Sequence, residues 1–255
     1  MVDRTKKPEK PLPVLDDKLG RGLQRVMARL RKDEVARQNP WQFLAYAMAR
    51  AKEAHSQLFQ DLWICWMSGE KRGGYFVEVG AADGVYLSNT YYLETRLGWT
   101  GILAEPNPRF AEALTRRSCI VSPLCVSSTT GERVSFLNVD MGELSRMESV
   151  NPGDGHEARR QRTAERIEVE TIRLNDLLER HNAPRQIDYL SVDTEGAELE
   201  ILSAFDFDRW DVRAMTVEHN YTPAREQLYA LMTSKGFKRL FPELSLFDDW
   251  YVKAA

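Results

Sequence analysis

The feature that most constrains the fold is an alternation of two kinds of segment along residues 73–255. Short apolar runs, typical of buried strands, alternate with segments in which apolar side chains recur at helical spacing. The apolar runs are YFVEVG, GILAEP, CIVSPLCVS, IDYLSVD, AMTVEHN and DDWYVK; the helical segments include PRFAEALTRRS, AELEILSAF and PAREQLYALMTSKG. This alternation predicts an α/β fold with a mostly parallel sheet and crossover helices on both faces.

Two stretches interrupt the alternation. VSSTTGERVSFLNVD predicts two extended segments joined by a turn at Thr130–Gly131. Residues 141–166 contain few apolar side chains and several turn formers, which predicts a long mobile loop. We expect the arginines of its 146–166 part to form a solvated charge run, and the alternative is a lid that grips an anionic substrate. These arginines are Arg146, Arg159, Arg160, Arg162 and Arg166.

The N-terminal part of the chain has a different pattern. Residues 1–16 are charged and contain prolines, which predicts a flexible tail, whereas residues 17–70 have helical periodicity interrupted at Asn39–Pro40. We therefore divide the chain into a tail, a helical appendage over 17–70 and an α/β domain over 71–255. The basic face of the first helix favours packing or self-association, so a homo-oligomer through these helices is one expectation.

Charge and cysteine content narrow the class of protein. The net charge of −3 gives no reason to expect a nucleic acid or an anionic membrane as partner. Three cysteines without metal-ligand spacing favour a reducing compartment. Neither a signal-peptide core nor an apolar stretch of about 18 residues is present. We expect a cytoplasmic protein that acts on a small molecule or a glycan.

A glycine turn follows the first strand of the predicted sheet. YFVEVGAADG places Glu78, Gly80, Asp83 and Gly84 at the carboxyl end of this strand, where open α/β sheets bind ligands. The turn lacks the G-x-G-x-x-G pattern of dinucleotide-binding folds, and its two carboxylates would repel a pyrophosphate. They suit a ligand with an ammonium group and sugar hydroxyls. Glu105 ends the next strand, where a carboxylate can accept both hydrogen bonds of a ribose diol.

These motifs resemble those of the FkbM family of S-adenosylmethionine-dependent methyltransferases. The resemblance covers about residues 56–254 and rests on FVEVGAADGVYLSNTYYLE, GWTGILAEPNP, IDYLSVDTEGAELEIL and WYVK. It implies a class I methyltransferase Rossmann-like fold, with a seven-stranded sheet whose last strand is antiparallel. It also implies that the glycine turn holds the methionine part of S-adenosylmethionine, that Glu105 holds the ribose and that PLCVSS lies beside the adenine. The implied cofactor-binding residues are Glu78, Gly80, Ala81, Asp83, Gly84, Ser88, Asn89, Glu105, Pro106, Asn107 and Val126.

Candidate catalytic residues follow two further strands. Asp193 and Glu195 come after IDYLSV, and Glu218 and His219 come after AMTV. We expect them to meet at the edge of the sheet that holds the cofactor. His219 is a candidate general base, with Asp193 to orient it or to act as the base itself and Glu195 in support. Alternatively, Asp193, Glu218 and His219 hold a divalent ion such as Mg²⁺, which would lower the pKa of an acceptor hydroxyl.

The motifs and the resemblance together favour S-adenosylmethionine-dependent O-methylation of a sugar, a glycan or a secondary metabolite. N-methylation stays open. A nicotinamide-dependent oxidoreductase is one alternative, and the missing third glycine weighs against it. A non-catalytic binding module on the same fold is another, and the presence of Asp193, Glu195 and His219 weighs against that.

Overall fold

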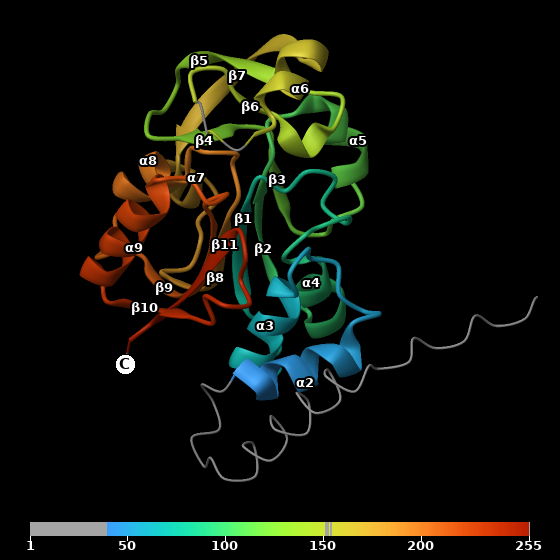
Figure 1. Cartoon of the computed structure of the whole chain (residues 1–255), viewed down its shortest axis with the longest axis vertical. Coiled ribbons are helices and arrows are strands. Elements are labelled where there is room, and N and C mark those ends of the chain that lie inside the picture. Colours follow the sequence, from blue (N-terminus) through green and yellow to red (C-terminus); the bar gives the residue numbers. More distant parts are fainter. Residues whose placement is uncertain (1–39, 151–152, 154, 255) are drawn as a thin grey trace, which may run out of the picture. The chain divides into compact units, whose positions relative to one another are not determined.

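The computed structural model describes residues 40–150, 153 and 155–254. The compact unit Phe43–Ala255 contains a seven-stranded sheet with the order β10-β11-β9-β8-β1-β2-β3 (Figure 1). In that order the strands are Phe237–Leu240, Asp248–Lys253, Asp211–Glu218, Gln186–Val192, Tyr75–Val79, Thr100–Ala104 and Ile120–Ser122. β11 runs antiparallel to both neighbours, and the other pairs are parallel. The predicted α/β fold and its antiparallel last strand are confirmed, and the sheet is therefore mixed.

Helices cover both faces of this sheet because side chains alternate along each strand. In β1, Val77 and Val79 belong to one buried cluster and Phe76 to another. The first cluster includes side chains of α7 (Leu174–Arg180), α8 (Glu198–Ser203) and α9 (Ala224–Ser234). The second includes side chains of α2 (Pro40–Arg50), α3 (Gln60–Met67), α4 (Tyr91–Leu97) and α5 (Ala111–Leu114), which follows the short helix η2 (Pro108–Phe110).

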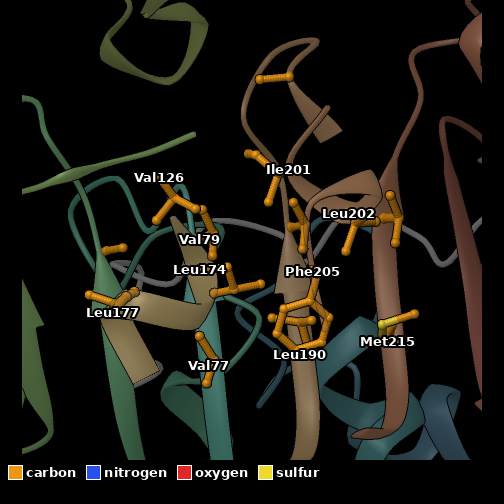
Figure 2. Packing of buried hydrophobic residues seen from close by; sticks show 14 of the residues in the cluster. Val77, Val79, Val126, Leu174, Leu177, Leu190, Ile201, Leu202, Phe205 and Met215 are labelled. Atoms are coloured by element: carbon orange, nitrogen blue, oxygen red, sulfur yellow. The ribbon is translucent and has the colours of Figure 1, made fainter. Parts of the chain in front are cut away.

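Figure 2 shows the first cluster from close by. Val77 and Leu190 on neighbouring strands point toward side chains of the covering helices, among them Leu174 of α7 and Leu202 of α8. All four are buried, and each such side chain stabilises the fold by about 1.5–3 kcal/mol relative to an exposed one. This packing fixes the strands whose carboxyl ends carry the candidate site.

The second cluster is rich in aromatic side chains. Trp63 of α3 stacks on Trp250 of β11 at a centroid distance of 5.0 Å, and Phe43 of α2 meets the same Trp250 edge-on at 5.5 Å. Residues 43–67 thus share a core with the sheet, whereas the sequence pattern predicted an appendage that ends at residue 70. The remainder of that appendage and the tail, residues 1–39, lie outside the described residues.

A second, four-stranded sheet has the order β4-β7-β5-β6. Its strands are Cys125–Ser127, Glu165–Arg173, Arg133–Asn138 and Arg146–Met147. The sequence pattern predicted a single strand in CIVSPLCVS, but the segment divides at Pro123, which has no N–H to donate to a ladder. Residues before this proline form β3 of the large sheet, and residues after it form β4 of the small one. The two extended segments predicted around Thr130–Gly131 are confirmed as β4 and β5.

The predicted mobile loop over 141–166 contains regular structure. It includes η3 (Gly142–Leu144), β6 and α6 (Glu157–Thr163), while residues 151, 152 and 154 lie outside the described residues. The expected solvated charge run is found at Arg162 and Arg166, which are exposed. The expectation of solvated arginines is wrong for Arg146 and Arg160. Both are buried, and each pairs with a carboxylate that offsets the cost of burying its charge.

Within the described part of the chain, no helix is both long enough and apolar enough to cross a bilayer.

The Trp63–Trp250 stack generates a test of the role of α3. Trp63→Ala removes a fully buried side chain, so we expect the free energy of unfolding to fall by about 3–5 kcal/mol. Trp63→Phe should give a smaller loss in the same direction and guards against complete unfolding. Denaturation in urea measures both, with the exposed Met48→Ala as the control. A Trp63→Ala protein as stable as the control would show that α3 is only loosely attached.

Candidate functional site

A cavity opens where the carboxyl ends of β1, β2, β8 and β9 meet. Its position is where open α/β sheets bind ligands. The start of α3 and the second sheet complete the wall. Most of the predicted cofactor-binding residues line the cavity: Glu78, Gly80, Ala81, Asn89, Glu105, Pro106 and Val126.

The remaining predicted cofactor-binding residues lie behind this wall and shape its loops. Asp83 accepts hydrogen bonds from the backbone N–H groups of Val85 and Tyr86, at 2.8 and 2.7 Å. Gly84 lies against the side chain of Arg117, and Arg117 Nη1 donates to the carbonyl oxygen of Gly84 at 2.7 Å. Ser88 donates to Glu78 at 3.0 Å. The buried Asn107 donates to Asn138 at 3.1 Å.

Gly80 is required where two strand ends approach each other. Its φ is +82°, a conformation that favours glycine, and a Cβ at this position would lie 1.7 Å from the backbone oxygen of Asp193. The sequence pattern explained Gly80 by the approach of a ligand, but the nearest obstacle is the turn that carries Asp193. Replacing Gly80 therefore damages the fold as well as the cavity.

Glu78 holds the loop that leads into α4. Its carboxylate accepts hydrogen bonds from the N–H of Asn89 at 2.7 Å and from the hydroxyls of Ser88 and Thr90. Burial raises the pKa of Glu78, and Arg117, 3.9 Å away, acts in the opposite direction. Asn89 donates to Ser191 at 2.8 Å, while its buried Oδ1, at the cavity wall, has no hydrogen-bond partner among the described residues.

Glu105 closes the neighbouring loop. Its two oxygens accept hydrogen bonds from the N–H groups of Ala82 at 2.9 Å and Asn107 at 2.8 Å. Burial raises the pKa of Glu105 to about 7. A carboxylate has about four lone-pair positions, so Glu105 retains acceptor capacity for a ligand diol.

A carboxyl cluster lies at the ends of β8 and β9. Asp193, Glu195 and Glu218 each place one oxygen within 4.8 Å of the others. Loss of hydration raises the pKa of Asp193 to about 7, and burial together with the charge of Asp193 raises the pKa of Glu218 well above its usual range. We infer that Asp193 and Glu218 retain at least one proton between them at neutral pH. The buried Oε2 of Glu218 has no hydrogen-bond partner among the described residues.

His219 does not join this cluster, contrary to the sequence-based expectation. Successive residues at the end of a strand point to opposite sides, so Glu218 faces the cavity and His219 faces away. His219 Nδ1 accepts the N–H of Tyr221 at 3.0 Å, and Nε2 lies 3.7 Å from Asp249. Burial lowers its pKa, and it lines a separate cavity whose wall also includes Glu218. The metal-ligand set Asp193, Glu218 and His219 is therefore not assembled.

Arg160 and Gln60 are site residues that sequence reasoning missed. Arg160 Nη2 donates to Glu195 at 2.6 Å, so the idea of a lid whose Arg160 grips an anionic substrate is wrong for this residue. No local pattern distinguishes Arg160 from its exposed neighbours. Gln60 lines the cavity and donates to Asp248 at 2.6 Å, and burial raises the pKa of Asp248 to about 8. Gln60 lies in the segment SQLFQDLWI, with which the part of the chain covered by the family resemblance begins.

The charged side chains of the described residues that line the cavity are carboxylic acids. Among the described residues that line it, none is lysine, arginine or histidine. The acidic lining residues are Glu78, Glu105, Glu143, Asp193, Glu195 and Glu218. Such a wall favours a cationic ligand and disfavours a phosphorylated one.

Comparisons with known proteins find similarity to methyltransferases. Residues 78–251 match the family model described as the methyltransferase FkbM domain. The curated methyltransferase sdnD of Sordaria araneosa is 39% identical over 83 residues, which cover 29% of this chain and 32% of the relative. The solved structure of methyltransferase FkbM from Methylobacillus flagellatus KT is 12% identical, with a TM-score of 0.46 over 92% of this chain and 60% of that one. The chain thus spans about a third of the curated relative and 60% of the solved one.

The raised carboxyl pKa values predict how stability depends on pH. A carboxyl group whose pKa is higher in the folded state stabilises that state fully below its unfolded pKa of about 4 and loses this contribution as the pH rises through the folded value. That folded value is about 7 for Glu105 and Asp193, so we expect the ligand-free protein to lose stability from pH 5 to pH 8. In Asp193→Asn this loss should be smaller by about 1–3 kcal/mol.

Urea denaturation at several pH values measures this difference. Asp208→Asn, at an exposed position, is the matched control and should follow the wild type. Equal pH dependence in wild type and Asp193→Asn would mean that Asp193 is fully hydrated.

Proposed function

The chain belongs to the FkbM family of methyltransferase domains, and we propose that it transfers the methyl group of S-adenosylmethionine to a hydroxyl of a sugar, a glycan or a secondary metabolite. The observation that carries this proposal is the cavity at the carboxyl edge of the sheet, whose charged residues, among those described, are all acidic. S-adenosylmethionine has a sulfonium and an ammonium group against a single carboxylate, so its net charge is positive and complements this wall.

The residues of the cavity fit the parts of this cofactor. Asn89 Oδ1, a buried acceptor at the wall without a described partner, suits an ammonium donor. Glu105 has acceptor capacity left for a ribose diol. Val126, Phe136 and Met147 contribute an apolar wall that suits the adenine. When bound, the cofactor supplies a methyl group already activated by a positively charged sulfur.

The same wall argues against the two alternatives. A nicotinamide dinucleotide carries a pyrophosphate, which six acidic side chains and no basic one would repel. A non-catalytic binding module has no use for carboxyl groups poised to exchange a proton near neutral pH, and Asp193 is such a group.

Asp193 is the general base of the proposed reaction. The acceptor oxygen gains a methyl group and must lose its proton, and a base with a pKa near neutrality is suited to take it. Asp193 lines the cavity, and Glu218 beside it keeps a proton that can be shared with it. The second sheet and the residues before α3 form part of the cavity wall around this site. Activity should therefore rise with pH through about 7, as Asp193 loses its proton.

Cofactor binding gives the first test of this function. Glu105→Gln removes a charge-assisted acceptor, so we expect the Kd for S-adenosylhomocysteine to rise by about 10–100-fold, the equivalent of about 1.5–3 kcal/mol. Isothermal titration calorimetry measures the change, and Glu112→Gln, on an exposed face of α5, is the matched control. Undiminished affinity in Glu105→Gln would remove Glu105 from the cofactor site.

The chemical step gives the second test. Asp193→Asn should lower turnover by about 10²–10⁴-fold while the affinity for S-adenosylhomocysteine stays near that of the wild type. His219→Gln should leave the rise of activity near pH 7 in place, because His219 faces away from the cavity. The measurement is formation of S-adenosylhomocysteine with a panel of neutral, amino and phosphorylated sugars.

Two outcomes would contradict this assignment. Full turnover in Asp193→Asn would remove the proposed base. Loss of activity on chelation, restored by Mg²⁺, would favour a metal-assisted reaction instead.

A further inference from the structure

Arg160 is a charged residue in an unusual environment. It lies on α6, in the segment between β6 and β7, and its side chain is completely buried. Burying a guanidinium group is costly unless it is paired and hydrogen-bonded. Its neighbours Arg159 and Arg162 are partly or fully exposed, so the burial of Arg160 is specific to its position on the helix.

The guanidinium group of Arg160 connects α6 to two parts of the cavity wall. Nε donates to the backbone oxygen of Leu144 at 2.9 Å, and Nη2 donates to Glu195 Oε2 at 2.6 Å. Leu144 ends η3, and Gly142 and Glu143 of the same short helix line the cavity. A planar guanidinium group can bridge two acceptors in fixed directions, which an ammonium group cannot do.

Glu195 occupies a backbone conformation that needs such support. Its φ is +59°, in the left-handed region that side chains with a Cβ rarely adopt. Glu198 holds the turn from the helix side, because it accepts hydrogen bonds from the N–H groups of Thr194 and Gly196. Arg160 also holds the turn, through the carboxylate of Glu195. Strained residues of this kind persist where the surrounding contacts over-determine them, and they concentrate at functional sites.

The pairing also decides the charge next to the proposed base. Glu195 lies within the carboxyl cluster with Asp193 and Glu218. The other acidic groups that interact with this cluster are Glu78 of β1, Glu198 of α8 and Asp248 of β11. Arg160 places a cation 2.6 Å from Glu195, so its loss would remove this compensating charge from the cluster.

We propose that Arg160 is a positioning residue that fixes the acceptor end of the cavity, by holding Glu195 in its strained turn and tying that turn to the wall formed by η3. This role rests on the proposed methyl transfer, because the end of the cavity next to Asp193 is where the acceptor must lie. The described hydrogen bonds of Arg160 go to Leu144 and Glu195, at the acceptor end, and not to Glu105 at the cofactor end. The cost of losing Arg160 should therefore appear in the use of the acceptor and in the proton equilibrium of Asp193.

Four variants test this role, together with one control. Arg160→Gln removes the charge, Arg160→Lys keeps it but cannot bridge the same two acceptors, and Glu195→Gln removes the partner. The double variant Arg160→Gln/Glu195→Gln leaves neither charge behind. Arg159→Gln is the matched control, since Arg159 pairs with the exposed Asp140 and not with the cavity wall.

The first measurement needs neither cofactor nor acceptor. Urea denaturation of the ligand-free proteins between pH 5.5 and 8.5 should show a steeper loss of stability with rising pH in Arg160→Gln than in the wild type. The double variant and Arg160→Lys should return toward the wild-type slope. A loss in Arg160→Gln that is the same at every pH would mean a purely structural role and would overturn the proposal.

The second measurement uses the active protein. Arg160→Gln should lower kcat/KM for the acceptor by about 10²-fold, with the rise of activity near pH 7 moved to higher pH. The Kd for S-adenosylhomocysteine should stay within about threefold of the wild-type value. An unmoved pH profile, or a parallel loss of cofactor affinity, would overturn the proposal.

The two arms keep this inference separate from the proposed function. If the wild type does not bind S-adenosylhomocysteine, the proposed function fails, while the pH dependence of unfolding still decides whether Arg160 compensates the cluster. If the wild type binds S-adenosylhomocysteine and catalyses methyl transfer, but the Arg160 variants have the same activity and pH dependence as Arg159→Gln, the proposed function stands and the role of Arg160 falls.

Discussion

The close approach of β1 and β8 at their carboxyl ends is the constraint on which the site depends. The N–H of Asp193 donates to Val79 O at 3.0 Å, and the N–H of Gly80 donates to Ala104 O at 2.9 Å, so the ladder continues to the last residue of each strand. A side chain at position 80 would overlap the backbone of Asp193. Because no side chain separates the strand ends, the carboxylates of neighbouring strands are forced into one cavity. The packing of the backbone thus brings the acidic side chains together in one cavity.

This crowding of acidic groups destabilises the folded protein, and it also raises the pKa of the proposed base Asp193. Burial disfavours each ionised carboxylate, and the neighbouring charges add to the effect at Asp193 and Glu218. The fold limits the cost in two ways: protons are retained on some carboxyl groups, and the buried arginines Arg117 and Arg160 each pair with acidic partners. A bound cation would relieve the remaining repulsion, so this crowding favours the binding of a positively charged ligand.

The large sheet and the cofactor end of the cavity follow from local sequence patterns, whereas the acceptor end does not. Apolar runs fix the strands, and strand ends are where ligands bind, so Glu78, Gly80 and Glu105 are identifiable without a structure. His219 was misplaced because the pattern does not show to which side the last residue of a strand turns. Arg160 was missed because its partner Glu195 is 35 positions away and no periodicity connects them. Of the small sheet, only β4 and β5 were predicted as extended segments; its separation from the large sheet was missed because a single proline divides one apolar run between the two sheets.

That division at Pro123 separates the chain into parts with different freedom to change. The inner strands of the large sheet each pair with two neighbours, so a substitution there disturbs many contacts at once. The segment from β4 to β7 leaves the sheet as a continuous excursion and returns to it through α7 and β8 (Figure 1). Its residues reach the cavity through Phe136, Glu143 and Met147, while buried residues such as Val169 and Ile172 anchor the excursion in the first cluster. A lineage of such proteins can therefore alter this excursion to reshape the pocket, and retain the strand ends that hold the reactive groups.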